Sequence, residues 1–312
     1  MASLKELASR QDRLTGGHRM CPGCGAPILV RTILMSVKEP VVVACATGCL
    51  EVSTTIFPYS AWKTPFIHTA FENAAATISG VESAYNALKK RGKIDKEIKF
   101  IAFGGDGGTY DIGLQSLSGA MERGHDILYV CYDNQGYMNT SVQRSSATPR
   151  GASTTTEPAG KISTGKKMMR KDLTEMMVSN NCVYVAQTTC GHWSDLNKKI
   201  EKAMSIKGPK FINVLQPCQL GWAYPMELTV ELSKVAAETC FWPLYEVENG
   251  VYKLNYDPKD KKKPLVDFLK PQGRFRHLFK PENKDLLVDL QREIDEKWTL
   301  LKKKCECFGA KA

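Results

Sequence analysis

The chain has 312 residues, 43% of them hydrophobic, and a formal net charge of +10. This composition suits one large α/β domain with an appendage. No apolar run is long enough for a transmembrane helix, and the opening MASLKELASRQDRL lacks the apolar core of a signal peptide, so we expect a cytoplasmic protein without membrane contact.

The first third of the chain predicts alternating helices and strands. Residues 1–20 are polar and indicate an arm on the surface. After CPGC a helix should begin at about Pro27, and short apolar runs predict strands at Val41–Ala44 and Phe66–Thr69. A long helix then follows, because apolar residues recur at helical spacing at Phe71, Ile78, Val81, Tyr85 and Leu88.

The middle of the chain predicts a unit of strand, glycine-rich turn, helix and strand. Lys99–Phe103 and Ile127–Tyr132 are short apolar runs typical of buried strands. Asp111 should cap the helix between them and Gly124 should end it. Its apolar stripe consists of Ile112, Leu117, Ala120 and Met121. In such a unit the two strands are parallel and belong to one sheet.

The second half continues this alternation and then departs from it. Residues 139–161 are rich in Ser, Thr, Pro and Gly and predict a long ordered loop. The next expected elements are a helix at Leu173–Val178, a strand at Cys182–Gln187, a helix at Ser194–Met204 and a strand at Phe211–Leu215. After these we expect a hairpin over Phe241–Tyr256 with Asn249-Gly250 at its turn, irregular chain over Leu265–Pro281 and an amphipathic helix at about Asp285–Lys303. We therefore divide the chain into an α/β domain, residues 1–218, and a C-terminal extension, residues 219–312.

Two polar residues directly follow the two central strands. Asp106 lies in the GGDGG turn and Asn134 follows the next strand. Open α/β sheets bind ligands at this edge. A carboxylate, an amide oxygen and the Gly136 carbonyl suit Mg²⁺, and a glycine-rich turn offers N–H groups to a diphosphate. GDG alone occurs as often in an ordinary turn without a ligand as in a ligand-binding turn. GDGG with Asn at the end of the next strand is a stronger signal and resembles the thiamine-diphosphate motif.

The eleven cysteines fall into distinct groups. An odd number, with Cys-x-x-Cys in a cytosolic setting, indicates metal or redox work rather than disulfides. Thiolates in turns bind zinc or iron–sulfur clusters, and composition does not separate the two. Four lie in turns that contain Gly or Pro: Cys21, Cys24, Cys49 and Cys218. Core packing is the expected role of Cys45, Cys131, Cys182, Cys190 and Cys240. No role is assigned to Cys305 and Cys307.

Longer motifs cover almost the whole chain. They are HRMCPGCG, ATGCLEV, PYSAWKTPFIHTAFENAAATISGVE, GGDGGTYDIG, YDNQGYMNT, QRSSATPRGASTTT, LQPCQLGW, WPLYEVENG and QGRFRHLF. With them the chain resembles the β subunit of pyruvate:ferredoxin oxidoreductase and its 2-oxoacid relatives. The resemblance implies a thiamine-diphosphate-binding fold with a mostly parallel sheet. It also implies coenzyme A-dependent oxidative decarboxylation of a 2-oxoacid, with electrons passed to ferredoxin. Pyruvate is the expected substrate; oxalate, 2-oxoglutarate and branched-chain oxoacids are alternatives.

The resemblance also implies cofactors and site residues. The cofactors are thiamine diphosphate, Mg²⁺ and a [4Fe-4S] cluster. Cluster ligands would be Cys21, Cys24, Cys49 and Cys218, and magnesium ligands Asp106, Asn134 and the Gly136 carbonyl. Asn139 and Thr47 would be catalytic. The cofactor-binding set is Gly48, Cys49, His68, Gly105, Asp106, Gly107, Gly108, Asn134, Gly136, Tyr137, Met138, Asn139 and Thr140. The chain departs from the family at Gln135 and Gly136, where the family has an acidic residue and Ala, and at Ser141, where it has Gly.

The expected partners follow from what the chain lacks and from its charge. We find no carboxylate suited to activating the pyrimidine ring, and the chain has room for one α/β domain of this kind. An α-type subunit should complete the site, and the resemblance adds γ-type and ferredoxin-like δ-type subunits. Lysine clusters at 161–171, 259–263 and 302–304 are solvated surface or a contact for an acidic protein. We expect no nucleic-acid partner, because no recognition motif is present.

Two functions of other classes remain open. A non-oxidative thiamine decarboxylase component would share Asp106 and Asn134 but has no need of four cysteines in turns. A zinc-binding assembly protein would share the cysteines but has no use for GDGG and Asn134.

Overall fold

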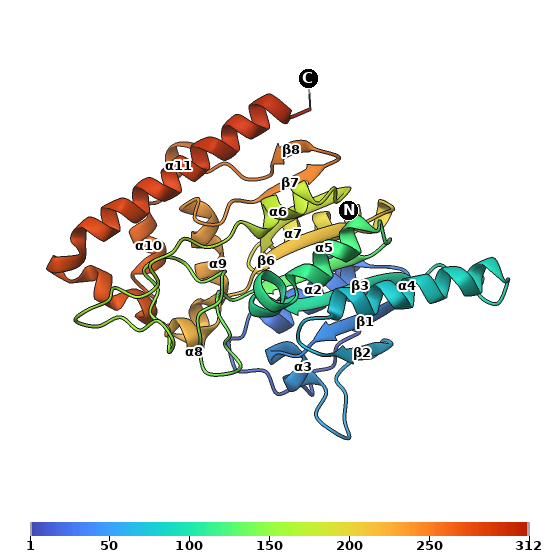
Figure 1. Cartoon of the computed structure of the whole chain (residues 1–312). Coiled ribbons are helices and arrows are strands. Elements are labelled where there is room, and N and C mark those ends of the chain that lie inside the picture. Colours follow the sequence, from blue (N-terminus) through green and yellow to red (C-terminus); the bar gives the residue numbers. More distant parts are fainter. Residues whose placement is uncertain (1, 311–312) are drawn as a thin grey trace.

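A computed structural model describes residues 2–310. A sheet of eight strands runs through its middle (Figure 1). The strand order is β2-β1-β3-β4-β6-β5-β7-β8. Six strands are parallel: β1 Val41–Ala46, β2 Phe66–Thr69, β3 Lys99–Gly105, β4 Leu128–Asp133, β5 Tyr184–Thr189 and β6 Lys210–Leu215. Two antiparallel strands, β7 Tyr245–Glu248 and β8 Val251–Leu254, extend one edge. The predicted α/β class with a mostly parallel sheet is confirmed, as is the hairpin.

Helices cover both faces of the sheet, as expected for parallel strands that are apolar on both sides. On one face the apolar sides of α2 Ala26–Ser36 and α7 Trp193–Ser205 pack on the strands. On the other lie α4 Ala74–Lys90, α5 Leu114–Glu122 and α6 Leu173–Ser179. The two central strands are buried almost throughout, and β4 is buried at every residue. The predicted helices around Leu173 and over Ser194–Met204 are therefore confirmed.

The in-register pairing of β3 and β4 positions the site. Gly105, at the end of β3, pairs with Tyr132 near the end of β4. The residues that follow the two strands, Asp106 and Asn134, consequently meet at one edge of the sheet. Strand β1 pairs with β3 on its other side, so the turn at Thr47 and Gly48 reaches the same edge. The short helix α3 Cys49–Thr54 follows, and Cys49 is its first residue rather than part of a turn.

Three details of the central unit and of the helix that precedes it differ from the sequence prediction. A π-helical turn, Gly107–Ile112, separates β3 from α5. It rotates the chain, so Asp111 does not cap the helix but accepts hydrogen bonds from the Tyr137 hydroxyl and the Ser146 N–H. For the same reason Ile112 is 56% exposed, whereas the rest of the predicted stripe is buried. Phe71 precedes α4 and is not part of that helix.

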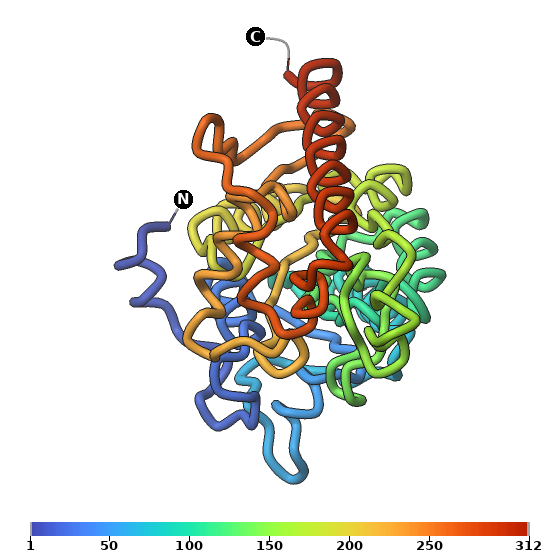
Figure 2. The backbone as a smooth tube through the Cα atoms, turned by 90° about the vertical axis from the view of Figure 1, so that its left-hand side faces the viewer, coloured from blue at the N-terminus to red at the C-terminus, as the bar shows by residue number. Residues whose placement is uncertain are grey.

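The C-terminal segment forms a third layer with a core of its own. It includes α8 Gln219–Trp222, α9 Thr229–Glu238, α10 Leu265–Leu269 and the long α11 Lys284–Phe308. Residues 265–281 are not irregular as predicted, because they form α10 and a 3₁₀ helix at Gly273–Phe279 whose apolar side chains enter this core. Figure 2 shows α11 in red, with its C-terminal end projecting from the body of the molecule.

Two other segments lie on this scaffold. The N-terminal arm contains one short helix, α1 Leu4–Ser9, and is anchored by buried Leu7 and Leu14. The predicted long loop, between β4 and α6, has no helix or strand and packs on the C-terminal segment through an ion pair between Arg150 and Glu293. No helix within residues 2–310 combines the length and the apolar character that crossing a membrane requires.

Candidate functional site

A cavity of about 260 Å³ lies at the carboxyl ends of β1, β3 and β4. The residues that line it are Thr47, Gly48, Cys49, Phe71, Gly105, Asp106, Gly107, Gly108, Tyr132, Asn134, Gly136, Tyr137, Met138, Asn139 and Thr140. All but two of them were singled out from the sequence as catalytic or cofactor-binding residues. The exceptions are Phe71, which was expected in a helix, and Tyr132, which was expected as a buried strand residue. His68 was expected in the site but lies outside the lining.

Three polar groups converge at the base of the cavity. The side-chain amide of Asn134 places one polar atom 2.8 Å from the Gly136 carbonyl oxygen and 2.9 Å from Asp106 Oδ1. With nitrogen in that place, the amide donates two hydrogen bonds. With oxygen there, it lies about as far from each of the other two oxygens as neighbouring ligands of an octahedral Mg²⁺ lie from one another, because a ligand distance of about 2.1 Å implies edges of about 3 Å. The residues present therefore fit a magnesium ion.

Asp106 carries the charge of this group, and it is buried. Its side chain accepts hydrogen bonds from the Ser145 hydroxyl at 2.5 Å and from the Asn134 N–H at 3.2 Å. Burial and the nearby Asp133 carboxylate raise the pKa of Asp106 well above its usual range. A buried carboxylate with two donors and a second carboxylate nearby gains strongly from a cation, which favours the ionised form.

A second buried polar atom in the lining is also available to bond a ligand. The Tyr132 hydroxyl has no hydrogen-bond partner among residues 2–310. It lies against Gly48, where a Cβ would come within 2.7 Å of it. At Gly107 a Cβ would come within 2.4 Å of the Tyr137 ring, which packs over the glycine-rich turn. Glycine at these two positions thus leaves the backbone close to the cavity, where its N–H groups are accessible to an anion.

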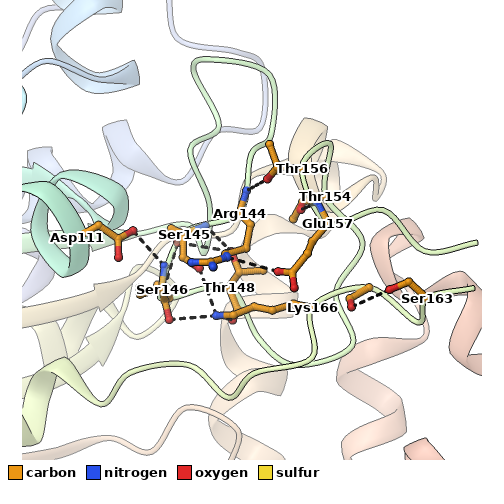
Figure 3. A network of polar contacts seen from close by, with 12 residues as sticks. Asp111, Arg144, Ser145, Ser146, Thr148, Thr154, Thr156, Glu157, Ser163 and Lys166 are labelled. Carbon is orange, nitrogen blue, oxygen red and sulfur yellow. Dashed lines mark hydrogen bonds and ion pairs between the residues drawn. The ribbon is translucent and has the colours of Figure 1, made fainter.

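The loop after β4 is held in place by a buried lysine (Figure 3). The Lys166 ammonium donates to the backbone carbonyls of Ser145, Ser146 and Thr148 at 3.2, 3.3 and 2.6 Å. These bonds fix the turn from which Ser145 reaches Asp106. Lys166 has no carboxylate within ion-pair distance among the described residues, and burial lowers its pKa to about 8. The lysine cluster at residues 161–171 was expected at the surface, which is wrong for Lys166, because its ammonium is enclosed by the three carbonyls of the loop.

Thr47 and His68 form a polar pair beside the cavity. Thr47 Oγ1 lies 2.8 Å from His68 Nε2, and that nitrogen lies 3.4 Å from Glu51 Oε2. The Thr47 hydroxyl also bonds the Thr69 carbonyl at 3.1 Å. His68 therefore contacts the lining residue Thr47 and orients its hydroxyl, but it does not line the cavity itself.

The four cysteines predicted as ligands come together at one end of the site. Burial raises the pKa of the Cys24 and Cys49 thiols to about 12, and the neighbouring sulfurs of Cys21 and Cys218 add to the rise. Cys49 also lines the cavity, which places this group beside Asp106. No three Cys, His, Asp or Glu side chains within residues 2–310 are arranged to hold a single metal ion.

Hydrogen bonds tie the cysteine turns to one another. The Gln216 amide donates to Cys24 Sγ at 3.7 Å, and the Gly221 N–H donates to Cys218 Sγ at 3.4 Å. Gln219, next to Cys218, donates to the Pro22 carbonyl at 2.8 Å. N–H donors directed at sulfur are typical of cluster sites. The other cysteines with predicted core roles are buried, as expected.

Comparison with known proteins agrees with this geometry. Residues 46–214 match the family described as "Thiamine pyrophosphate enzyme, C-terminal TPP binding domain". The chain is 53% identical to pyruvate synthase subunit PorB of Thermotoga maritima, over 96% of this chain and 95% of that protein. It is 52% identical to the subunit of the same name from Methanocaldococcus jannaschii, over 94% and 97%. A 2-oxoglutarate:ferredoxin oxidoreductase from Magnetococcus marinus shares the fold, with a TM-score of 0.56, 18% identity and coverage of 72% of this chain and 81% of that one.

The buried ammonium of Lys166 predicts a specific pH dependence of stability. Its pKa of about 8 lies below the 10.5 of an unperturbed lysine, so between these values the unfolded chain binds more protons than the folded one. The difference in free energy of unfolding between the parent protein and Lys166→Met should therefore shift in favour of the parent as the pH increases from 8 to about 10. Thermal unfolding of both proteins at several pH values measures this, with exposed Lys167→Met as the control. Parallel pH profiles for the parent and Lys166→Met would contradict the assignment.

Proposed function

The chain belongs to the family of pyruvate synthase PorB subunits, the β subunits of pyruvate:ferredoxin oxidoreductases, and we propose that its cavity binds thiamine diphosphate through Mg²⁺ beside a [4Fe-4S] cluster. The observation that carries the proposal is the convergence of Asp106, Asn134 and the Gly136 carbonyl at the base of a cavity that Cys49 also lines. One sheet edge thus offers oxygen ligands for a hard cation and thiolates for a cluster.

Each part of the lining has a task in this proposal. Asp106, Asn134 and the Gly136 carbonyl hold the ion, and N–H groups of the turn at Gly107 and Gly108 receive the diphosphate. The Tyr132 hydroxyl, which has no partner among residues 2–310, is available to hydrogen-bond the bound cofactor. When bound, thiamine diphosphate supplies the chemistry that removes CO₂ from a 2-oxoacid. Asn139 and Thr47 lie in the lining and are the residues that we place near the reacting carbon, with His68 orienting the Thr47 hydroxyl.

The cluster is proposed to rest on Cys21, Cys24, Cys49 and Cys218. Without a metal the Cys24 and Cys49 thiols keep their protons, because burial raises their pKa values to about 12. Iron would ionise them and release these protons. With Cys49 in the cavity wall, electrons have a short route from the cofactor to the cluster. We propose ferredoxin as the final acceptor and coenzyme A as the acceptor of the acyl group.

The proposal includes partners and a substrate. The relatives are named as subunits of pyruvate synthase, and the chain has one thiamine-binding domain, at residues 46–214. An α-type subunit would supply the second half of the thiamine site and the activating carboxylate, and γ-type and ferredoxin-like δ-type subunits would complete the complex. Pyruvate is the proposed 2-oxoacid because the relatives quoted above are pyruvate synthase subunits. We place the complex in the cytoplasm.

Asp106 and Asn134 can be tested separately. Asp106→Asn keeps the size of the buried side chain and one of its two acceptor oxygens, and it removes the charge. Cofactor retention should therefore fall at least tenfold. Asn134→Ala should weaken retention less, and excess Mg²⁺ should partly restore it, because a neutral ligand is lost. The measurement is thiamine diphosphate and iron content of one reconstituted sample at several Mg²⁺ concentrations, and iron should be unchanged. Stoichiometric thiamine diphosphate in Asp106→Asn would refute the assignment.

The fourth cluster ligand is the subject of another test. Cys218→Ser should lose most iron and sulfide and the broad visible absorbance of a [4Fe-4S] cluster, since a thiolate ligand is removed. Cys190→Ser is the matched control: this thiol is buried near the same turns and bonds Ser233, yet is not in the proposed ligand set. Anaerobic iron and sulfide analysis of both variants gives the result. A full cluster in Cys218→Ser, or its loss in Cys190→Ser, would show that the ligand set is wrong.

A further inference from the structure

Gln135 has a backbone conformation that is unusual for its residue type. It lies between Asn134 and Gly136, is fully buried, and has a φ of 66°. This left-handed region is disfavoured for residues with a Cβ and persists where surrounding contacts impose it. The direction of the two neighbouring groups, the Asn134 amide and the Gly136 carbonyl, depends on this one residue.

Three contacts hold Gln135 in place. Its N–H donates to Asp133 Oδ1 at 3.0 Å, and its carbonyl accepts from the Thr148 hydroxyl at 2.7 Å. Its side-chain oxygen accepts from the Arg274 guanidinium at 2.6 Å, across 139 residues of sequence. The side-chain nitrogen has no hydrogen-bond partner in the described part of the chain. The side chain is therefore anchored to Arg274, and it is not part of the cavity lining.

Arg274 is itself immobilised by its surroundings. It is 5% exposed, donates to the Gln272 side chain at 2.9 Å and lies over the Trp222 ring, 3.9 Å from its centre. Trp222 in turn donates from Nε1 to the Asn134 carbonyl at 2.7 Å. The stacked pair thus holds the turn at two successive residues, through the Asn134 backbone and through the Gln135 side chain.

We propose that Arg274 is a positioning residue for the cation site: through Gln135 and Trp222 it sets the turn that directs the Asn134 amide and the Gly136 carbonyl toward Asp106. The proposal rests on the proposed function and adds a role for the C-terminal segment, which supplies both Arg274 and Trp222. A guanidinium suits this role because its planar fork donates to two amide oxygens while its face lies on an indole ring. Lysine keeps the charge but not this geometry.

The test uses Mn²⁺ as the probe in the complex assembled with its partner subunits, at saturating thiamine diphosphate. The EPR signal of free Mn²⁺ gives its dissociation constant. Arg274→Met should raise that constant at least fivefold, and Gln135→Ala should raise it by no more than Arg274→Met does, because the route through Trp222 remains. The double variant should bind Mn²⁺ as Arg274→Met does, because the Gln135 side chain acts only through its contact with Arg274. Arg274→Lys should fall between the parent and Arg274→Met. Exposed Arg276→Met, two residues away, should remain within twofold of the parent.

Iron content and visible absorbance of every sample report whether the adjoining cysteine turns are intact, and both should be unchanged. An Mn²⁺ dissociation constant within twofold of the parent in Arg274→Met, or additive effects in the double variant, would overturn the role of Arg274 and leave the proposed function standing. If the Arg274→Met complex does not assemble, the test rests on the Gln135→Ala complex. An Mn²⁺ dissociation constant equal to that of the parent in this variant overturns the proposal. A parent complex that fails to bind Mn²⁺ with thiamine diphosphate would overturn the proposed function as well.

Discussion

The buried carboxylate of Asp106 is the constraint around which the molecule is arranged. A charged oxygen in the interior is costly unless donors or a cation surround it. Here the described chain supplies the Ser145 hydroxyl and one N–H, and it places the carboxylate of Asp133 nearby, which makes ionisation harder still. In the proposed function, a cation supplies the stabilisation that these donors leave incomplete. The glycine-rich turn, the adjoining amide of Asn134 and the Gly136 carbonyl all leave room for one.

Segments far apart in the sequence meet at this carboxylate. Asp106 and Asn134 follow strands β3 and β4, the loop held by Lys166 provides Ser145, and the C-terminal segment provides Arg274 behind the site. The strands β7 and β8 extend the same sheet, and α11 packs against β8. The division of the chain at residue 218 stays a prediction, since the two parts share one sheet and contribute to one site.

Local sequence patterns identified most of the framework but not its long-range contacts. The apolar runs of β3 and β4 and the GGDGG turn were sufficient to bring Asp106 and Asn134 to one sheet edge, because strand ends follow directly from strand positions. The π-helical turn was not foreseen, since helical periodicity does not reveal an extra residue in a turn, and Asp111 and Ile112 were misplaced as a result. Lys166 and Arg274 were missed because their partners are backbone carbonyls and amide groups distant in sequence, which leave no periodic signal. The roles of the four cysteines and of Asn139 and Thr47 stay predictions.

We propose that one edge of the sheet holds both the cation of the thiamine site and an iron–sulfur cluster. A spectroscopic distance measurement tests it directly. In the assembled complex with Mn²⁺ in place of Mg²⁺, the EPR signal of the reduced cluster should broaden and relax faster than in the Mg²⁺ sample, because Cys49 and Asp106 line the same cavity. A cluster signal that is identical with Mn²⁺ and Mg²⁺, in a sample shown to contain bound Mn²⁺, would show that the cation and the cluster do not lie at the same edge of the sheet.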